Sequence, residues 1–463
     1  MPLHLSVAIS RSAEQSLNAQ IRTSICEEIE GGILQPGTRL PSSRQLAADL
    51  GVSRSVVVEA YGQLVAEGFL EAARGAGTRV VRHLPREPVV PCLLDSSDVP
   101  VARWDLRVSG QGAPAFPHKE WLTAYQRVLR SPGAVPDGYP PLAGVPELRS
   151  ELSRHLGRLR GVRATPSQVM VTAGFAQGLS LLCADLVASG QRELAVEEPG
   201  HPGQRHFVAE NGLRPVPVPV DAEGIDVEAL AATSARAVLV TPAHQFPVGY
   251  TLSAPRREAL ARWARDVDGL VIEDDYDGAL WYDRAARPLA LQRLAPDHVV
   301  YAGTASKVLG AGLRLGWLAG PEQLLHRLLR LRGRQDLGTD AFTQAAFAEF
   351  LGSGLFDRHL RRLTETCAAR RSALDEAVRR HLPGAAVLGS AAGVHAYVRL
   401  PPHTDETAVV GGALRRSVLV RGGGGYRALP RPGDAGLVVG FAHLPKSGVT
   451  EAVREVGAAL SGR

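Results

Sequence analysis

Hydrophobic residues recur at every fourth position near the beginning of the chain. Leucine or isoleucine occupies positions 17, 21, 25, 29 and 33. Because four residues make roughly one helical turn, this spacing predicts an amphipathic helix over residues 17–33. The Pro36-Gly37 pair that follows marks a turn and ends the pattern.

A helix-turn-helix unit is predicted directly after this turn. Ser42 and Ser43 are suited to cap a second helix, and Ser53 is suited to cap a third helix over residues 54–67. A helix, a short turn containing glycine and another helix form the helix-turn-helix pattern. Residues 69–81 surround a glycine-rich turn and predict a β-hairpin wing. The apolar face of the second helix is Leu46, Ala47 and Leu50.

The chain changes character after this unit. Prolines at positions 85, 88, 91 and 100 favour an extended, semi-rigid linker. The sequence therefore predicts three parts, which are an N-terminal helical unit at residues 11–82, a linker at residues 83–103 and a large domain at residues 104–463.

The large domain alternates short apolar runs with longer helical stretches. Near-continuous apolar strands between helices are typical of a mostly parallel sheet covered on both faces, so the predicted fold class is α/β. From about residue 342, a long helix at 356–380 and strands near 394–400, 418–421 and 437–441 suit a smaller α+β lobe. The strands predicted for the main sheet are residues 169–172, 194–197, 237–241, 270–273, 299–302 and 315–319.

Composition narrows the class of protein. The 463 residues are 45% hydrophobic and 21% charged, which excludes a disordered or fibrous chain. No apolar run is long enough to suggest a membrane span, and the first residues lack the regions of a signal peptide. The four cysteines lie far apart, so neither a zinc site nor a disulfide framework is expected. These features predict a cytoplasmic, multi-domain protein.

Net charge alone does not predict a nucleic-acid partner. The whole chain carries +5, but residues 1–85 contain eight arginines against seven glutamates and one aspartate, so this segment is neutral. DNA binding must therefore depend on where the arginines stand. The alternative is a small helical bundle with scattered surface arginines. The residues at DNA-facing positions of a winged helix-turn-helix are Arg44, Arg54, Ser55 and Arg74.

The amino-acid sequence of this region resembles that of a known family. Residues 40–54, then Ala60-Tyr61 and residues 67–69, resemble the winged helix-turn-helix of GntR-type bacterial regulators. The resemblance implies that Arg44 and Arg54 contact operator DNA. A third basic position of that family falls on Val58 here.

Lysine is rare in the chain, which contains only Lys119, Lys307 and Lys446. Lys307 ends the motif Gly-Thr-Ala-Ser-Lys at residues 303–307, directly after a predicted strand. This is the place where open α/β sheets bind ligands. Such a lysine suits a Schiff base with pyridoxal phosphate. If the Ser306-Lys307 pair stood alone, an exposed loop would be the better interpretation.

Residues around Lys307 suit a phosphate group. Thr304 and Ser306 supply hydroxyls, and Arg314 supplies a guanidinium that can make two parallel contacts. Residues 172–178 join a predicted strand to a helix, whose free N–H groups form a second phosphate-binding element. Many strand–helix turns share this composition, so the turn is weak evidence alone.

An acidic run follows the predicted strand at residues 270–273. It reads Asp274-Asp275-Tyr276-Asp277. A buried carboxylate keeps the ring nitrogen of pyridoxal phosphate protonated, and Tyr276 could donate to the phenolate oxygen of the ring. The alternative interpretation of such an acidic run is a magnesium site.

Together and in this order, these motifs resemble the fold-type I aminotransferases over residues 104–445. Further matching segments are residues 138–149, 197–200, 241–249 and 313–316. The resemblance implies that pyridoxal 5′-phosphate is the cofactor, that Lys307 forms the internal aldimine, and that Asp274 and Tyr276 contact the ring nitrogen and O3′. It also implies a phosphate cup of Gly174, Phe175, Ala176, Ser306 and Arg314, with Tyr139 contributed by a second subunit.

A GntR-type winged helix joined to an aminotransferase-like domain is the layout of the MocR/GabR family of transcription regulators. Residues 244–247 and 273–277 resemble that family more closely than free-standing aminotransferases. The resemblance implies a head-to-tail homodimer that binds operator DNA. Its signal would be pyridoxal phosphate itself or a small amino compound.

Three positions depart from these patterns. His201 stands where many members stack a tyrosine on the cofactor, and Phe246 replaces an asparagine of free-standing aminotransferases. Val438 stands where an arginine would hold the substrate carboxylate, a contact worth about 1.5–3 kcal/mol. Ordinary transamination is therefore not expected. The arginines that could substitute, each equally suited to an ordinary surface, are Arg205, Arg399, Arg421 and Arg427.

Three functions remain open at this stage. The first is a DNA-binding regulator whose cofactor site reports a small ligand, and the second is an active aminotransferase with an accessory DNA-binding domain. The third is a DNA-binding protein whose large domain only dimerises. Val438 argues against the second, and the joint presence of Asp274, Tyr276, Lys307 and Arg314 argues against the third. The sequence thus predicts the regulator.

Overall fold

The computed structural model divides the chain into two units, residues 1–100 and 101–463. Each unit is described by itself. The predicted linker lies outside the described residues except for residues 102 and 103. The residues that the structure describes are 9–10, 15–30, 33–73, 77–81, 102–108, 116–131, 133, 135, 138–283, 287–428 and 434–461.

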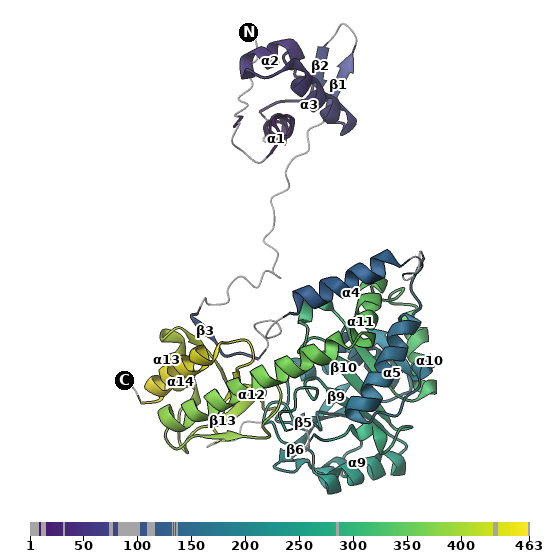
Figure 1. The fold of residues 1–463 in the computed structure, drawn as a ribbon, viewed down its shortest axis with the longest axis vertical. Coiled ribbons are helices and arrows are strands. Elements are labelled where there is room, and N and C mark those ends of the chain that lie inside the picture. Colours follow the sequence, from purple (N-terminus) through teal and green to yellow (C-terminus); the bar gives the residue numbers. More distant parts are fainter. Residues whose placement is uncertain are drawn as a thin grey trace. The chain divides into compact units, whose positions relative to one another are not determined.

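The N-terminal unit is three helices and a two-stranded hairpin around one small core (Figure 1). Ile21, Ile25 and Ile29 are fully buried, as their spacing predicted. The first helix ends at Glu30 rather than at residue 33, because two glycines follow in the sequence and disfavour helix. Ile33 is consequently 73% exposed, and Leu34 is buried. The elements are α1 (Leu17–Glu30), α2 (Ser43–Leu50), α3 (Arg54–Ala66), β1 (Leu70–Ala73) and β2 (Gly77–Val80).

The turn between α2 and α3 is built as predicted, with one exception. Ser42 caps α2, and its side chain accepts a hydrogen bond from the Gln45 N–H. Gly51 ends α2 with φ at 64°, a left-handed conformation that suits glycine. Ser53 stands at the N-cap of α3 but makes no side-chain capping bond. Its hydroxyl lies 2.8 Å from the Ser55 hydroxyl instead, so the predicted capping role of Ser53 is wrong.

The C-terminal unit is organised around an eight-stranded sheet with the strand order β4-β11-β10-β9-β8-β5-β6-β7. β11 is antiparallel to both of its neighbours and β7 is antiparallel to β6, while the other pairings are parallel. The sheet is thus mostly parallel, which confirms the predicted fold class. The strands are β4 (Val169–Thr172), β5 (Glu193–Glu198), β6 (Arg214–Asp221), β7 (Gly224–Ile225), β8 (Ala237–Val240), β9 (Leu270–Asp275), β10 (Val299–Thr304) and β11 (Gly316–Ala319).

Helices cover both faces of this sheet. Along β4, Met170 packs in one hydrophobic cluster while Val169 and Val171 pack in another, because successive strand residues point to opposite faces. The first face is covered by α6 (Phe175–Ala188), α7 (Pro202–Glu210) and α10 (Glu322–Arg332). The second is covered by α5 (Pro146–Arg160), α8 (Val227–Ala231), α9 (Ala254–Asp266) and α11 (Ala341–Gly352), with α4 (His118–Arg130) packed outside α11.

The predicted smaller lobe follows the sheet. Its centre is a four-stranded antiparallel sheet with the order β12-β13-β16-β15. The long helix α12 (Leu355–His381), predicted at residues 356–380, runs between the main sheet and this lobe (Figure 1). The other elements are β3 (Trp104–Asp105), β12 (Ala386–Leu388), β13 (His395–Arg399), α13 (Glu406–Arg415), β14 (Val418–Leu419), β15 (Arg421–Gly422), β16 (Gly436–Gly440) and α14 (Lys446–Leu460).

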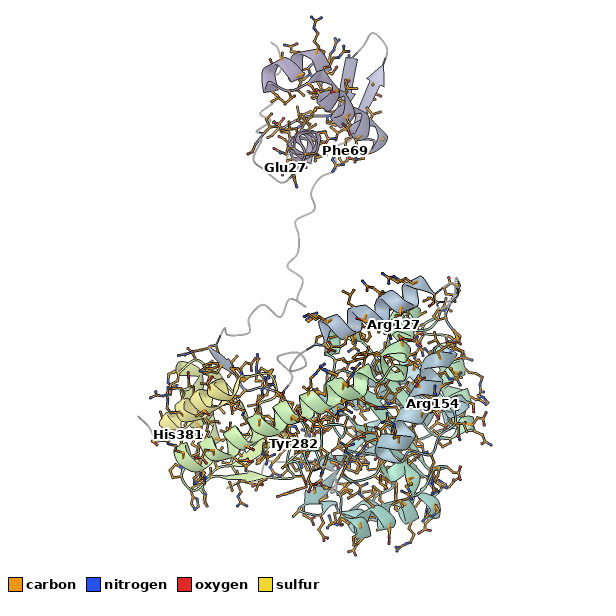
Figure 2. The ribbon with its side chains drawn as sticks, viewed as in Figure 1. Glu27, Phe69, Arg127, Arg154, Tyr282 and His381 are labelled. Carbon is orange, nitrogen blue, oxygen red and sulfur yellow. The ribbon has the colours of Figure 1, made fainter. Side chains whose placement is uncertain are left out.

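The lobe is tied to the carboxyl end of β9. Figure 2 labels Tyr282, whose hydroxyl donates to the Gly393 carbonyl at 2.7 Å. The neighbouring Trp281 forms a β-bridge with Ala392. The smaller lobe therefore contacts the segment that follows the carboxyl end of β9. No helix among the residues described is long and apolar enough to cross a membrane.

Candidate cofactor site and nucleic-acid interface

A cavity of about 430 Å³ opens at the carboxyl ends of β9 and β10. Both strands are parallel and central in the sheet, so their ends converge on one place, as expected for ligand sites of open α/β sheets. The cavity is lined by residues from the strand ends, the starts of α6 and α7, and the smaller lobe. Predicted cofactor residues among them are Phe175, Ala176, His201, Asp274, Tyr276, Thr304, Ser306, Lys307 and Arg314.

Asp274 has an oxygen atom without a partner. Its Oδ2 accepts a hydrogen bond from the Gln204 side chain at 3.0 Å, whereas its buried Oδ1 has no partner among the described residues. Burial raises the pKa of Asp274 to about 8, and the Gln204 bond lowers it in part. A buried carboxylate oxygen left unpaired is costly unless a donor meets it. Asp274 Oδ1 is therefore free to accept a hydrogen bond from a group bound in the cavity.

The neighbouring acids are all used within the protein. Glu273 accepts from the backbone N–H groups of Leu291 and Gln292 at 2.8 and 2.9 Å. Asp275 pairs with the buried Arg160 at 2.6 Å. Because strand residues alternate in direction, Glu273 and Asp275 point away from the face that Asp274 occupies. The acidic run thus does not converge on a magnesium ion, and that alternative is not supported.

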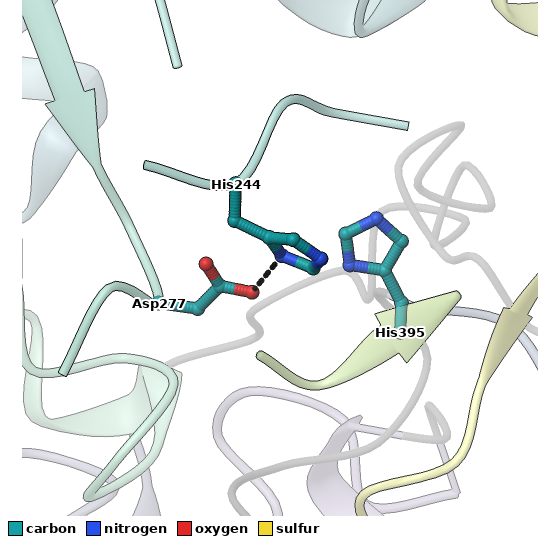
Figure 3. A group of neighbouring side chains, drawn as sticks. All are labelled: His244, Asp277 and His395. Atoms are coloured by element: carbon teal, nitrogen blue, oxygen red, sulfur yellow. Dashed lines mark hydrogen bonds and ion pairs between the residues drawn. The ribbon is translucent and has the colours of Figure 1, made fainter. Parts of the chain in front are cut away.

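Asp277 belongs to a buried cluster with two histidines, which Figure 3 shows. His244 Nδ1 lies 3.0 Å from Asp277 Oδ2, and the two histidine rings are 4.8 Å apart between centroids. His244 Nε2 and His395 Nδ1 have no hydrogen-bond partner among the described residues. The Tyr276 hydroxyl donates to the His244 carbonyl at 2.9 Å, so the cluster fixes the position of the Tyr276 side chain. The sequence analysis did not foresee it.

Lys307 lies at the same end of the sheet, three residues after β10. No hydrogen bond or ion pair joins its amine to any residue that the structure describes. Burial lowers the pKa of Lys307, while the negative charges of Asp277 and Asp274 raise it in part. A lysine with a lowered pKa spends more time as the neutral amine, which is the nucleophilic form.

A second group of residues at the cavity suits an oxyanion. The start of α6 presents backbone N–H groups, preceded by Gly174 with φ at 94°. A Cβ atom at Gly174 would lie 3.4 Å from the Arg314 guanidinium, so Arg314 lies directly beside this turn. The Thr304 hydroxyl donates to the Ser306 hydroxyl at 2.9 Å beside them. These groups together form a cradle of the kind that binds phosphate.

His201 and Phe246 form a part of the cavity wall near Tyr276. Burial, helped by the positive charges of Lys307, Arg421 and Arg205, lowers the pKa of His201 to about 4. The ring is therefore neutral at pH 7, and its Nδ1 accepts from the Gln204 N–H at 3.2 Å. Its ring centroid lies 5.3 Å from that of Phe246. His201 thus presents a neutral aromatic ring to the cavity.

Val438 and the four arginines named above have different surroundings. Val438 is fully buried in β16. Arg205 donates to the carbonyls of Gly200 and Tyr426 at 2.9 Å, and Arg427 pairs with Asp434, so both serve the protein's own structure. Arg399 is exposed on β13 outside the cavity. Arg421 lines the cavity.

Tyr139 does not join the site within one chain. It is 80% exposed and is absent from the cavity wall. Its predicted contribution from a second subunit stays a prediction.

The predicted DNA-facing residues lie on the outside of the N-terminal unit. Arg44 at the start of α2 and Arg54 and Ser55 at the start of α3 are all exposed. The Tyr61 hydroxyl donates to the Pro41 carbonyl at 2.9 Å and holds α3 against the segment before α2. Val58 is 49% exposed on α3. Arg74 lies outside the described residues.

Comparison with known proteins assigns both units. Residues 17–80 match the family of bacterial regulatory proteins called gntR, and residues 110–456 match class I and II aminotransferases. The chain is 34% identical over 461 residues to the HTH-type pyridoxine biosynthesis transcriptional regulator PdxR of Corynebacterium glutamicum, which covers 99% of each chain. The chain belongs to the MocR/GabR family of transcription regulators. The predicted family and fold are confirmed.

Other relatives agree with this MocR/GabR assignment. The probable rhizopine catabolism regulatory protein MocR of Rhizobium meliloti is 32% identical over 396 residues, which are 81% of this chain and 80% of that protein. The α-aminoadipate aminotransferase LysN of Thermus thermophilus, solved with N-(5′-phosphopyridoxyl)-L-leucine, has a TM-score of 0.67 and 27% identity over 77% of this chain and 92% of its own. Aminotransferases of this class depend on pyridoxal phosphate, which makes it the cofactor implied for this chain.

Proposed function

We propose that this MocR/GabR-family regulator binds pyridoxal phosphate in the cavity and senses pyridoxal phosphate itself or a small amino compound. The observation that carries the proposal is the unpartnered, buried Asp274 Oδ1. It lines the same cavity as the amine of Lys307 and the oxyanion cradle at α6. One cavity thus offers an acceptor, a nucleophile and a phosphate-binding end.

The residues present fit the cofactor chemically. Asp274 would accept the N–H of the pyridine ring, and Lys307 would hold the aldehyde carbon covalently. Phe175, Ala176, Ser306 and Arg314 would bind the phosphate, beside Gly174 and Thr304. When bound, pyridoxal phosphate supplies an electron-withdrawing ring and a reactive aldehyde.

The side walls would position the ring. His201, neutral at pH 7, would stack on one face of the cofactor. Burial, with the negative charges of nearby carboxylates, raises the pKa of Tyr276 well above its usual value, so Tyr276 keeps its proton. In this structure that proton is donated to the His244 carbonyl, and it would turn to the phenolate oxygen of the ring when the cofactor binds. The Gln204 side chain donates to Asp274 Oδ2, which orients the carboxyl group and leaves its Oδ1 for the cofactor.

The predicted three-part division completes the proposal. Residues 11–82 would bind operator DNA, residues 83–103 would link the parts, and residues 104–463 would receive the signal. We further propose a head-to-tail homodimer in which the exposed Tyr139 reaches the partner's cavity. A ligand changes DNA binding only if its affinity differs between the two arrangements of the dimer.

A second candidate function is an aminotransferase with an accessory DNA-binding domain. The complete set of Lys307, Asp274 and Tyr276 in one cavity favours it. The buried Val438 supplies no carboxylate clamp at the position where free-standing aminotransferases have an arginine, which argues against this second function. Steady turnover of an amino donor with a keto acid would favour this second function over sensing.

Titration of a protein–DNA complex tests the proposal. Full-length protein would first select a bound duplex from random-sequence DNA, and the affinity for that duplex would then be measured with and without pyridoxal phosphate, and with L-alanine or L-glutamate added. We expect one of these additions to change the affinity in the wild type but not in the Lys307→Ala variant. An unchanged affinity under all conditions contradicts the proposal.

A further inference from the structure

The charges that line the cavity are unbalanced. Lys307, Arg314 and Arg421 are basic, whereas Asp274 is the one carboxylate among the described residues of the cavity wall. Within the proposed function, Lys307 and Arg314 are used by the cofactor, and Asp274 by its ring nitrogen. Arg421 is left without a counter-charge.

Arg421 is also unpaired within the protein. No ion pair or side-chain hydrogen bond joins it to any of the residues described. This distinguishes it from Arg205, which binds two carbonyl groups, and from Arg427, which pairs with Asp434. Its positive charge reaches the cavity: after burial, it helps to lower the pKa of His201, and it offsets part of the rise that burial causes in the pKa of Tyr426. Arg421 is exposed to solvent, so the lack of a partner alone carries no cost. Its place on the cavity wall is what suits this guanidinium to an anion that enters the cavity.

The strand register explains how Arg421 reaches this place. In the antiparallel pair of β15 and β16, Arg421 stands directly opposite Val438. Side chains of directly opposed residues lie on the same face of a sheet, with Cβ atoms about 5 Å apart. Arg421 therefore projects from the same face as Val438, one strand further toward the sheet edge.

The surroundings of Arg421 favour a single negative charge. The cavity residues that pack with Val438, which stands opposite Arg421, are Val108, Phe246 and Tyr426, and they are apolar or aromatic. The oxyanion cradle at α6, by contrast, combines a helix start, two hydroxyls and a guanidinium, and so suits a phosphate dianion. One guanidinium, presenting two parallel N–H groups, matches one planar carboxylate.

We propose that Arg421 binds the carboxylate of an amino compound that enters the cavity beside the cofactor, so that the effector is an amino acid rather than a simple amine. This inference rests on the proposed function. It makes Arg421 a residue that determines effector specificity, one strand away from the position that Val438 occupies.

Two stable ligands that differ by one carboxylate test this role. They are N-(5′-phosphopyridoxyl)-L-alanine and N-(5′-phosphopyridoxyl)ethylamine, and their affinities for full-length, cofactor-free protein would be measured by calorimetry. We expect the wild type to bind the alanine adduct about 10- to 100-fold more tightly, the range of a charge-assisted hydrogen bond. Arg421→Ala should abolish this preference, and Arg421→Lys should keep part of it.

Arg399→Ala is the matched control, because Arg399 is exposed on the same four-stranded sheet but lies outside the cavity. It should keep the wild-type preference. Equal binding of both adducts to the wild type, or a preference that survives Arg421→Ala, overturns the role of Arg421 while leaving the cofactor site intact. If neither adduct nor pyridoxal phosphate binds, the proposed function itself fails, and the role of Arg421 with it.

Discussion

The two units of this regulator present their functional residues in opposite ways. In the N-terminal unit, Arg44, Arg54 and Ser55 are exposed, and nothing in their immediate surroundings distinguishes them from ordinary surface residues. In the C-terminal unit, Asp274 and Lys307 are largely buried, and their pKa values are shifted toward the neutral forms. The difference follows from their partners. DNA is bound from outside, whereas a small reactive cofactor has to be enclosed.

This contrast determines how far the ligand site of each unit can be recognised in the structure of the chain alone. A buried carboxylate oxygen or amine without a partner is an energetic cost, so it points to a missing ligand. An exposed arginine is solvated and carries no such cost. The cofactor site is therefore supported by the structure of the chain alone, while the DNA contacts depend on family membership and on experiment.

The largest expected effect separates the two units completely. Lys307→Ala should abolish covalent retention of pyridoxal phosphate after borohydride reduction, because no other described lysine lines the cavity. DNA binding in the absence of cofactor should be retained. Intact-mass measurement and a DNA titration check both expectations. Lys119→Ala, which removes an exposed lysine on α4, should retain the cofactor fully.

Asp274→Asn should have the next largest effect. Replacing the carboxylate by an amide removes the charge from the proposed bond to the ring nitrogen, and affinity for pyridoxal phosphate should fall about 10- to 100-fold. Equilibrium dialysis would measure the affinity. An unchanged affinity would show that Asp274 does not contact the cofactor, and Asp266→Asn, an exposed change on α9, should leave it unchanged.

The same variant should change how the stability of cofactor-free protein depends on pH. The pKa of Asp274 is raised from 3.8 in the unfolded chain to about 8 in the folded one. The folded state therefore holds the proton more tightly, and this contribution to stability is lost as the pH rises from about 4 to about 8. Asp274→Asn removes that loss, so between pH 5 and pH 8 the variant should gain about 4 kcal/mol relative to the wild type, roughly 1.4 kcal/mol for each pH unit. Urea unfolding at pH 5 and pH 8 measures the difference, and a constant difference would contradict the raised pKa.

Arg54→Ala should weaken DNA binding about tenfold, the effect of losing one charged contact to a base or phosphate. Cofactor binding should not change, because Arg54 belongs to the other unit. The matched control is Arg22→Ala, since Arg22 is paired with Glu67 and lies on α1. Equal losses of DNA and cofactor binding would mean that the two units are not separable.

Val58→Arg should produce the smallest effect. Val58 is 49% exposed on α3, so an arginine fits there without burying charge. It would restore the basic position that the GntR pattern has, and DNA affinity should rise about threefold, with a steeper dependence on salt. Unchanged affinity and salt dependence would place Val58 away from the DNA.

Much of this fold was predictable, because apolar runs between helices define a mostly parallel sheet. β6 escaped prediction, since it contains prolines at positions 215, 217 and 219, which normally exclude a central strand. The Arg214 N–H donates to the Arg192 carbonyl, on the side of β6 that faces β5. Because successive N–H positions alternate between the two edges of a strand, the backbone nitrogens of the three prolines lie on the other edge, where β6 pairs only with the short β7. The prolines therefore break few hydrogen bonds.

The site was predictable as far as its motifs are local in sequence. Asp274 and Lys307 each follow a recognisable strand, so their place at one sheet edge could be inferred. The partners of Asp275 and Asp277 could not be inferred, because Arg160, His244 and His395 come from distant segments of the sequence. The position of Arg421 depends on the register of β15 against β16, which no local pattern specifies.

The proposed cofactor site depends most on Lys307, the residue that would hold the cofactor. The most direct test is to incubate full-length protein with pyridoxal phosphate, reduce with borohydride, and map the modified residue by peptide mass spectrometry. The chain has three lysines, so the map distinguishes them fully. Stoichiometric modification of Lys307 is the predicted result. Modification confined to Lys119 or Lys446, or no modification, would contradict the proposed cofactor site.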